Sequence, residues 1–189
     1  MSHRDRLLSL LVERSLALGE FTLASGARST YYIDARLTTM SAEGQFLVGA
    51  VGLEAVRAHF PRARWIGGLT LGADPLACAI AHRSWLEGPP LDAFTVRKSA
   101  KDHGTGQRIE GGVPRAAPVV IMEDTLTRGG SALEALQVLD DHGAEILGVL
   151  ALVDREAGGS SRIRAGGHEV VSLFTANDIL RAAGHEPGA

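Results

Sequence analysis

The sequence predicts an α/β fold in which helices cover both faces of a parallel sheet and a small subdomain is added at the N-terminus. After residue 60, strand-like and helix-like segments alternate along the chain, which is typical of parallel sheets. Two of the strand-like segments, Pro118–Glu123 and Ile146–Val153, are apolar runs of the kind found in buried parallel strands. The N-terminal segments do not follow this alternation, so we expect them to form the added subdomain.

The first 40 residues are predicted to form a helix and a hairpin. Ser2 and Asp5 have the spacing of a capping pair, and they open a leucine-rich helix that ends near Gly19. Two short extended runs, Glu20–Ala24 and Thr30–Ala35, lie on either side of a turn that contains glycine.

The remainder of the chain is predicted to alternate strands and helices. Pro61 stops a long helix, because proline cannot continue one, and Gly143 closes a later helix. The expected elements are, in order, a helix from about Ser41 to Phe60, a strand at Arg64–Gly68, a helix from about Asp74 to Leu86, a strand at Asp92–Arg97, a polar loop at Lys98–Arg115, a strand at Pro118–Glu123, a loop at Asp124–Gly130, a helix from Ser131 to about His142, strands at Ile146–Val153 and Glu169–Phe174, and a short helix opened by Thr175 with Asp178.

Length and composition limit the classes of protein to consider. The 189 residues fit one domain, and the net charge of -3 argues against a general nucleic-acid or anionic-membrane binder. The single cysteine, Cys78, allows no intrachain disulfide and favours a reducing compartment; its apolar neighbours predict that it is buried. No signal-peptide pattern opens the chain, and the apolar run Ile146–Val153 is far too short to span a membrane. We therefore expect a cytoplasmic protein with no membrane or nucleic-acid partner.

The segment from Val119 to Ser131 carries the strongest chemical signal. A buried strand runs into two adjacent acids, Glu123 and Asp124, and a hydroxyl- and glycine-rich loop then opens a helix. Ligands bind beyond the carboxyl ends of strands in open α/β sheets, and amides at a helix N-terminus bind phosphate. Thr127, Arg128 and Ser131 would add donors, while the acids would face sugar hydroxyls or a developing cationic carbon.

An ordinary strand-to-helix turn is the alternative interpretation of this segment. In that case Ser131 caps the helix and the two acids are simply exposed. The segment lacks the spacing of a Walker loop and the GxGxxG pattern of a dinucleotide site.

A second segment, from Val96 to Gly111, is rich in cations and glycines. It holds four cations and a histidine within twelve residues, and a loop of that kind could close over a polyanionic substrate. A solvated charged loop is the alternative. Lys98 and Lys101 weaken that alternative, because they are the only lysines among the 19 lysine and arginine residues.

Both segments resemble known motifs. Glu123–Ser131 resembles the motif with which type I phosphoribosyltransferases bind phosphoribosyl pyrophosphate (PRPP), and the cationic segment resembles the catalytic loop of orotate phosphoribosyltransferases. Three further stretches, Phe21–Asp34, Gly67–Pro75 and Leu152–Glu156, are similar to that family's N-terminal hairpin, its pyrophosphate loop and a strand end whose arginine contacts orotate.

The resemblance implies a type I phosphoribosyltransferase fold that forms one domain over residues 1–189. Residues 1 to about 40 and the C-terminal segment would contribute a hood, and residues 41 to about 160 the α/β core. It also implies a homodimer with shared active sites, since the family's loop reaches into the partner subunit's site, and a Mg²⁺ ion held mainly through PRPP rather than by protein ligands.

The resemblance implies a role for each matching residue. Catalysis is expected from Lys98, Lys101, His103 and Asp124, and orotate binding from Thr127 and Arg155. PRPP binding is expected from Arg97, Lys98, Lys101, His103, Glu123, Asp124, Thr125, Leu126, Thr127, Arg128, Gly129, Gly130 and Ser131.

The chain departs from the family pattern at three places. Ala24 and Leu71-Gly72 stand where some members have a lysine and a Tyr-Lys pair, so the corresponding lysine contacts are not expected. Arg128 replaces a residue that is usually small.

The expected activity is transfer of the phosphoribosyl group from PRPP to N1 of orotate, which gives orotidine 5'-phosphate and pyrophosphate in pyrimidine (UMP) biosynthesis. Two alternatives remain open at this point. One is a type I phosphoribosyltransferase for a purine or uracil, which would need neither Arg155 nor the Lys98–His103 pattern. The other is a non-catalytic PRPP-sensing regulator, against which the acidic net charge argues.

Overall fold

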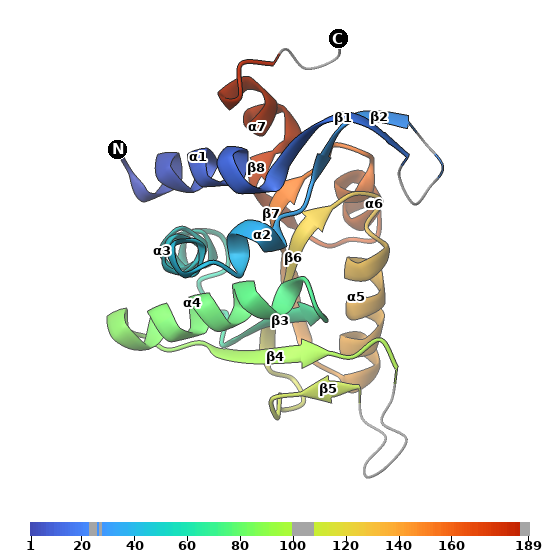
Figure 1. The fold of residues 1–189 in the computed structure, drawn as a ribbon. Coiled ribbons are helices and arrows are strands. Elements are labelled where there is room, and N and C mark those ends of the chain that lie inside the picture. The colour runs from blue at the N-terminus through green and yellow to red at the C-terminus, as the bar shows by residue number, and fades with distance from the viewer. Residues whose placement is uncertain (23–25, 27, 100–107, 186–189) are drawn as a thin grey trace.

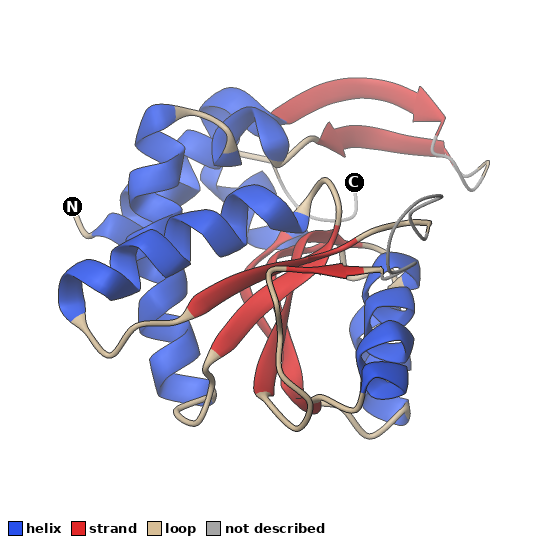
Figure 2. Cartoon of the chain, turned by 90° about the horizontal axis from the view of Figure 1, so that it is seen from below, coloured by secondary structure: helices blue, strands red, loops and turns tan. Residues whose placement is uncertain are grey.

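The computed structural model describes residues 1–22, 26, 28–99 and 108–185. A central sheet has helices packed on both of its faces, and a separate hairpin projects beside it (Figures 1 and 2). This architecture confirms the predicted α/β fold. Within the described residues, no helix is both long and apolar enough to cross a bilayer.

The six strands of the central sheet lie in the order β5-β4-β3-β6-β7-β8, and every neighbouring pair is parallel except β4 and β5. Their bounds are β3 (Trp65–Leu69), β4 (Asp92–Val96), β5 (Ile109–Glu110), β6 (Pro118–Leu126), β7 (Glu145–Asp154) and β8 (Val170–Thr175). The chain leaves β3 toward β4 on one side and leaves β6 toward β7 on the other. The carboxyl ends of β3 and β6 therefore form a topological switch point, where open α/β sheets bind ligands.

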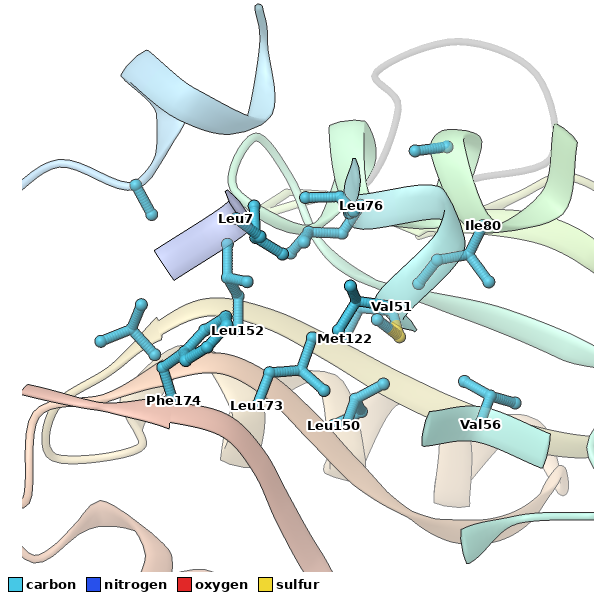
Figure 3. Close-up of a cluster of buried hydrophobic side chains, with 14 of the residues drawn as sticks. Leu7, Val51, Val56, Leu76, Ile80, Met122, Leu150, Leu152, Leu173 and Phe174 are labelled. Carbon is cyan, nitrogen blue, oxygen red and sulfur yellow. The ribbon is translucent and has the colours of Figure 1, made fainter. Parts of the chain in front are cut away.

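Alternating side chains of the central strands enter two separate hydrophobic clusters. Val120 and Met122 of β6 belong to one cluster, whereas Val119 and Ile121 belong to the other. The first cluster also contains buried residues of α1 (His3–Ser15), α3 (Ala42–His59), α4 (Ala73–Glu87) and α7 (Ala176–Ala182), and Figure 3 shows part of it. The second contains buried residues of α5 (Gly130–His142) and α6 (Gly159–Ala165). Burial of both faces explains why β6 and β7 are apolar runs.

The N-terminal hairpin forms its own two-stranded antiparallel sheet, β1 (Leu16–Thr22) with β2 (Arg28–Ile33). Pairing begins at Leu16 opposite Ile33, so the first helix ends at Ser15, and the predicted end near Gly19 is wrong. Cross-strand hydrogen bonds compete with the helix here. The predicted division into hood and core stays a prediction.

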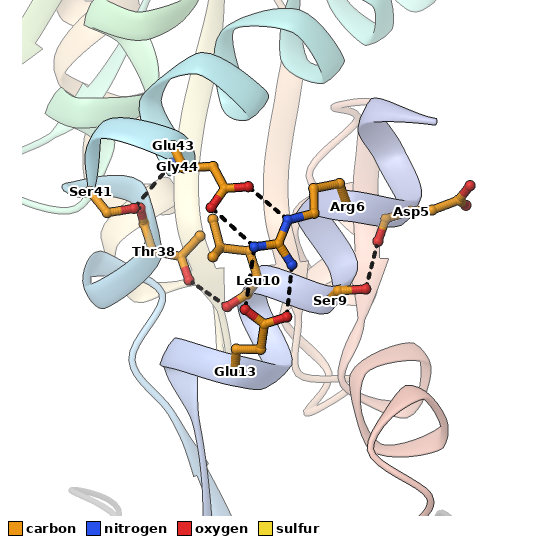
Figure 4. Close-up of polar contacts among 9 residues, drawn as sticks. All are labelled: Asp5, Arg6, Ser9, Leu10, Glu13, Thr38, Ser41, Glu43 and Gly44. Atoms are coloured by element: carbon orange, nitrogen blue, oxygen red, sulfur yellow. Dashed lines mark hydrogen bonds and ion pairs between the residues drawn. The ribbon is translucent and has the colours of Figure 1, made fainter. Parts of the chain in front are cut away.

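Polar contacts attach α1 to the short helix α2 (Arg36–Thr39) and to α3 (Figure 4). The guanidinium of Arg6 donates to the carboxylates of Glu13 and Glu43, at 2.7 Å in each case. The hydroxyl of Thr38, on α2, donates to the carbonyl of Leu10 on α1 at 3.3 Å. These contacts position α2, which the sequence did not predict, against the first helix.

Other parts of the sequence prediction also need correction. Strand β6 continues to Leu126, three residues beyond its predicted end, because β7 pairs with it as far as Leu126 opposite Asp154. The predicted polar loop contains a short strand, β5, and helix α6 was not predicted. Cys78 is exposed on α4 rather than buried, since its side chain lies on the outer face of that helix. The capping boxes at Ser2 and Thr175 are confirmed.

Candidate active site

A cavity of about 750 Å³ opens at the switch point between β3 and β6. Residues of the hairpin, of the loop after β3, of the end of β6 and of the segment after β7 line it. They are Tyr32, Ile33, Asp34, Ala35, Arg36, Leu69, Thr70, Leu71, Gly72, Lys98, Glu123, Asp124, Thr125, Thr127, Arg128, Ser131, Arg155 and Ala157.

The two adjacent acids lie near the carboxyl end of β6 and are partly buried. Burial, together with the neighbouring charge of Asp124, raises the pKa of Glu123 to about 8. Burial also raises the pKa of Asp124, although the Thr125 amide at 2.8 Å and the Arg36 charge act in the opposite direction. The alternative in which both acids are simply exposed is therefore wrong.

Asp124 lies against the loop that follows β3. A Cβ atom added to Gly72 would come within 2.5 Å of an Asp124 carboxylate oxygen. A glycine at this place thus lets the loop backbone approach the acid closely. Asp74 holds the same loop in position, because it accepts hydrogen bonds from Thr70 at 2.6 Å and from Thr95 on β4 at 2.8 Å.

The turn from β6 into α5 forms the second part of the cavity wall. Gly129 has φ of +76° and caps α5, so the alternative in which Ser131 caps the helix is wrong. The first turn of a 13-residue helix presents free amides and a positive dipole end, which favours an anion. Thr127, Arg128 and Ser131 line the cavity beside it, as a phosphate site requires.

Three residues of the segment from β6 into α5 that were predicted to bind PRPP are not among those that line the cavity. Leu126 is fully buried in the hydrophobic cluster beneath the loop. Gly129 and Gly130 form the turn and the start of the helix instead. Their contribution to a ligand would come from the backbone rather than from a side chain.

Arg155 follows β7 and is held over the ring of Tyr31, with 4.5 Å between the guanidinium carbon and the ring centroid. Its amide donates to the Leu126 carbonyl at 2.8 Å, which ties the segment to β6. Its Nε is buried and has no hydrogen-bond partner among the described residues. Because an unpaired buried donor is costly, this atom indicates a site for an acceptor that a ligand supplies.

The described residues at the start of the predicted cationic loop lie at two adjoining hollows. Lys98 is exposed and lines both the cavity and a neighbouring hollow of about 420 Å³ on the β4 side, whereas Arg97 lines only the neighbouring hollow. Arg108 anchors the base of the loop by donating to the carbonyls of Arg97 at 2.9 Å and Lys98 at 3.1 Å. Lys101 and His103 lie outside the described residues.

Two cavity residues on the hairpin side received no role in the sequence interpretation. Arg36 and Asp34 line the cavity and bond to each other. The Asp-x-Arg spacing was the available signal, but such a pair is common on exposed turns. Only the fold shows that it faces the two acids of β6.

A metal cage is not evident in the described parts of the chain. They contain no group of three or more His, Cys, Asp or Glu residues that could hold a metal ion. The carboxylates nearest the expected substrate are Glu123, Asp124 and Asp34, all in the cavity wall.

Comparisons of sequence and of structure both find orotate phosphoribosyltransferases as relatives. No family model matches the chain. The orotate phosphoribosyltransferase of Sorangium cellulosum is 45% identical over 181 residues, which cover 95% of this chain and 94% of the relative. Among solved structures, Mycobacterium tuberculosis orotate phosphoribosyltransferase with Fe(III) dicitrate superposes with a TM-score of 0.83 at 39% identity, covering 94% of this chain and 99% of that one. A structure of the same mycobacterial enzyme in complex with PRPP gives a TM-score of 0.79 at 36% identity, with the same coverage.

Proposed function

The chain belongs to the orotate phosphoribosyltransferase family, and on that premise we propose that it transfers the phosphoribosyl group from PRPP to N1 of orotate. The products are orotidine 5'-phosphate and pyrophosphate, in the synthesis of UMP. One observation carries the proposal: a single cavity is lined by an anion-binding helix start, a pair of acids and an arginine with an unsatisfied buried donor.

Each part of this wall fits one part of the substrates. The amides at the start of α5, with Thr127 and Ser131, fit the 5-phosphate. Arg155 fits the orotate carboxylate, because a guanidinium offers two parallel donors and its Nε is available. Glu123 and Asp124 fit the ribose hydroxyls, which can donate to the Asp124 carboxylate and to the carbonyl oxygen of the protonated Glu123 carboxyl group.

The bond-breaking step depends most on Asp124 and on the cations. As the bond from the anomeric carbon to pyrophosphate breaks, positive charge develops on the ribose and negative charge on the leaving group. The Asp124 carboxylate stabilises the former, while Lys98, and on the sequence resemblance Arg97, Lys101 and His103, would stabilise the latter. Closure of the loop would exclude water, which otherwise competes with N1 of orotate.

We propose that Mg²⁺ is required and is held mainly by PRPP. The ion prefers six oxygen ligands and retains waters, and the carboxyl groups of Glu123 and Asp124 at the end of β6 could hold those waters without forming a closed cage. When bound, the ion would neutralise pyrophosphate charge. PRPP is titrated into the protein in two experiments, one with Mg²⁺ and one with a chelator and no Mg²⁺. Equal affinity for PRPP in the two experiments would contradict the proposal.

Loss of orotate absorbance in the ultraviolet, with and without PRPP and Mg²⁺, tests the main proposal. We expect PRPP-dependent consumption of orotate and none of uracil, hypoxanthine or adenine. Turnover of one of those bases instead would favour the alternative transferase. PRPP binding without turnover of any base would favour the non-catalytic regulator.

We further propose a homodimer in the cytoplasm in which the cationic loop serves the partner's site. Arg97 lines the adjoining hollow and not the main cavity of its own subunit, which supports a role across an interface. Exposed large apolar side chains on α3 and α4 and at the end of α2 are suited to association; they are Leu37, Met40, Phe46, Trp85 and Leu86. A two-fold interface would create two equivalent shared sites.

Complementation tests the shared site. Lys101→Ala and Asp124→Asn proteins, each nearly inactive, are unfolded and refolded together. If the loop acts across the interface, each mixed dimer has one site with both defects and one with neither, so activity returns. If it acts within its own subunit, every site keeps one defect, and mixed dimers without recovered activity contradict the proposal.

A further inference from the structure

We propose that Arg36 binds the pyrophosphate group of PRPP and that Asp34 holds it in position for that contact. The inference rests on the proposed function and adds a binding residue that neither the sequence motifs nor the resemblance indicates. It follows from the geometry of the hairpin side of the cavity.

The Arg36 side chain is fixed by a two-point contact with Asp34. Its Nε donates to Oδ1 of Asp34 at 3.0 Å, and its Nη2 donates to Oδ2 at 3.1 Å. The backbone amide of Arg36 also donates to Oδ1, at 3.1 Å. Nη1 takes part in none of these bonds, so the guanidinium is oriented and still has donors for an anion.

The backbone that carries Arg36 is itself well anchored. Arg36 is the first residue of α2, and the last two residues of that short helix, Thr38 and Thr39, are buried. The Thr38 and Ser15 hydroxyls are hydrogen-bonded at 2.7 Å. The Thr38 hydroxyl also donates to the Leu10 carbonyl of α1 (Figure 4). A binding residue on a rigid element loses little freedom when the ligand arrives.

The distribution of charge in the cavity indicates which anion Arg36 meets. Four of the described lining residues are cationic: Arg36, Lys98, Arg128 and Arg155. Arg128 lies in the turn that fits the 5-phosphate, and Arg155 is stacked on Tyr31 where it fits orotate. Arg36 and Lys98 therefore remain for the most highly charged group, the pyrophosphate.

Arg36 also lies near the place where pyrophosphate leaves. Its charge is close enough to Asp124 to act against the burial that raises the pKa of that acid. Asp124 in turn touches the loop at Gly72, and this loop lines the cavity beside Arg36. The chain has no lysine at positions 71 and 72, so a cation from the hairpin side supplies charge that this loop lacks.

Binding measurements with PRPP alone and with pyrophosphate alone, each with Mg²⁺, test the assignment. Arg36→Ala is expected to raise both dissociation constants roughly tenfold. This is the low end of the range for losing a hydrogen bond to a charged group, because the Arg36 side chain is partly exposed. The KM for PRPP should rise in parallel, while the KM for orotate changes less than about twofold. Asp34→Asn should give a smaller loss, since it frees the guanidinium without removing it.

Arg14→Ala is the matched control. Arg14 donates to the Leu37 carbonyl at 3.0 Å and lines the adjoining hollow of about 330 Å³, but it is not a lining residue of the main cavity. The Arg14→Ala substitution removes the same charge, and we expect it to change both dissociation constants less than twofold. Arg36→Gln, which keeps most of the side chain, is measured as well in case Arg36→Ala does not fold.

The outcomes separate this assignment from the proposed function. Equal losses in the Arg14 and Arg36 variants, a loss confined to orotate, or unchanged pyrophosphate binding in a folded Arg36 variant would overturn it while orotate turnover by the unmodified chain stands. Failure of the unmodified chain to bind PRPP would overturn both. A loss specific to Arg36 and to pyrophosphate-bearing ligands supports it.

Discussion

The two sides of the cavity are built in different ways. The β6 side is one continuous stretch, in which a buried strand, two acids, a tight turn and a helix start follow one another between residues 118 and 131. The hairpin side combines residues from β2, α2 and the segment after β7. Tyr31 and Arg155, for example, are in contact there although they are far apart in sequence. A continuous wall is visible in the sequence, whereas an assembled wall becomes visible only when the chain folds.

This difference also separates the kinds of chemistry. The β6 side holds the adjacent acids Glu123 and Asp124 and the phosphate turn, where we expect the bond changes to take place. The hairpin side holds arginines that are oriented by a carboxylate or a ring, and these fit substrate recognition. We therefore expect substitutions on the β6 side to lower kcat and substitutions on the hairpin side to weaken binding.

The largest effect is expected for Asp124→Asn. It should lower kcat by on the order of 10²-fold with PRPP binding retained, because it removes an electrostatic stabiliser of the developing charge. Steady-state kinetics and PRPP titration measure the two effects. Asp140→Asn, on the exposed face of α5, is the control. Near-normal kcat in folded Asp124→Asn protein would show that the acid has no such role.

Arg155→Ala should weaken orotate binding by roughly 10- to 100-fold, because a charge-assisted partner worth about 1.5–3 kcal/mol is removed. PRPP binding should change far less. Arg155→Lys keeps the charge without the paired donors and should fall between the two. Equal losses for orotate and PRPP would place the carboxylate site elsewhere.

Glu123→Gln should alter how stability depends on pH. Because the pKa of Glu123 is raised from 4.5 to about 8, the folded protein retains a proton that the unfolded chain releases. The associated stability is complete below pH 4.5 and is lost as the pH rises through about 8.

A neutral glutamine avoids that loss. The variant should therefore gain stability relative to the unmodified chain as the pH rises, by on the order of 1–3 kcal/mol at alkaline pH after allowing for water in the cavity. Urea unfolding at several pH values measures the difference. A difference that does not vary with pH would show that Glu123 titrates normally.

The smallest effect is expected for Tyr31→Leu. The ring contributes about 0.5–1 kcal/mol to holding Arg155 at a partly exposed site, so orotate binding should weaken about two- to fivefold. Tyr31→Phe keeps the ring and should bind orotate normally. A loss in the phenylalanine variant as large as in the leucine variant would point to the hydroxyl instead of the ring.

The sequence predicted those parts of the molecule that depend on neighbouring residues. Capping boxes at Ser2 and Thr175, the order of the longer strands and helices, and the acid pair followed by a glycine turn all follow from interactions within a few residues. The resemblance of the same stretches to a known family predicted the fold that the structure shows.

The tertiary structure decided what depends on contacts between distant segments. Pairing with β7 set the true end of β6, and pairing with β2 ended the first helix at Ser15. The raised pKa of Glu123 is due mainly to burial, which no local pattern specifies. The Asp34–Arg36 pair looks in sequence like any surface turn, and it becomes part of a substrate cavity only because the hairpin packs beside the end of β6.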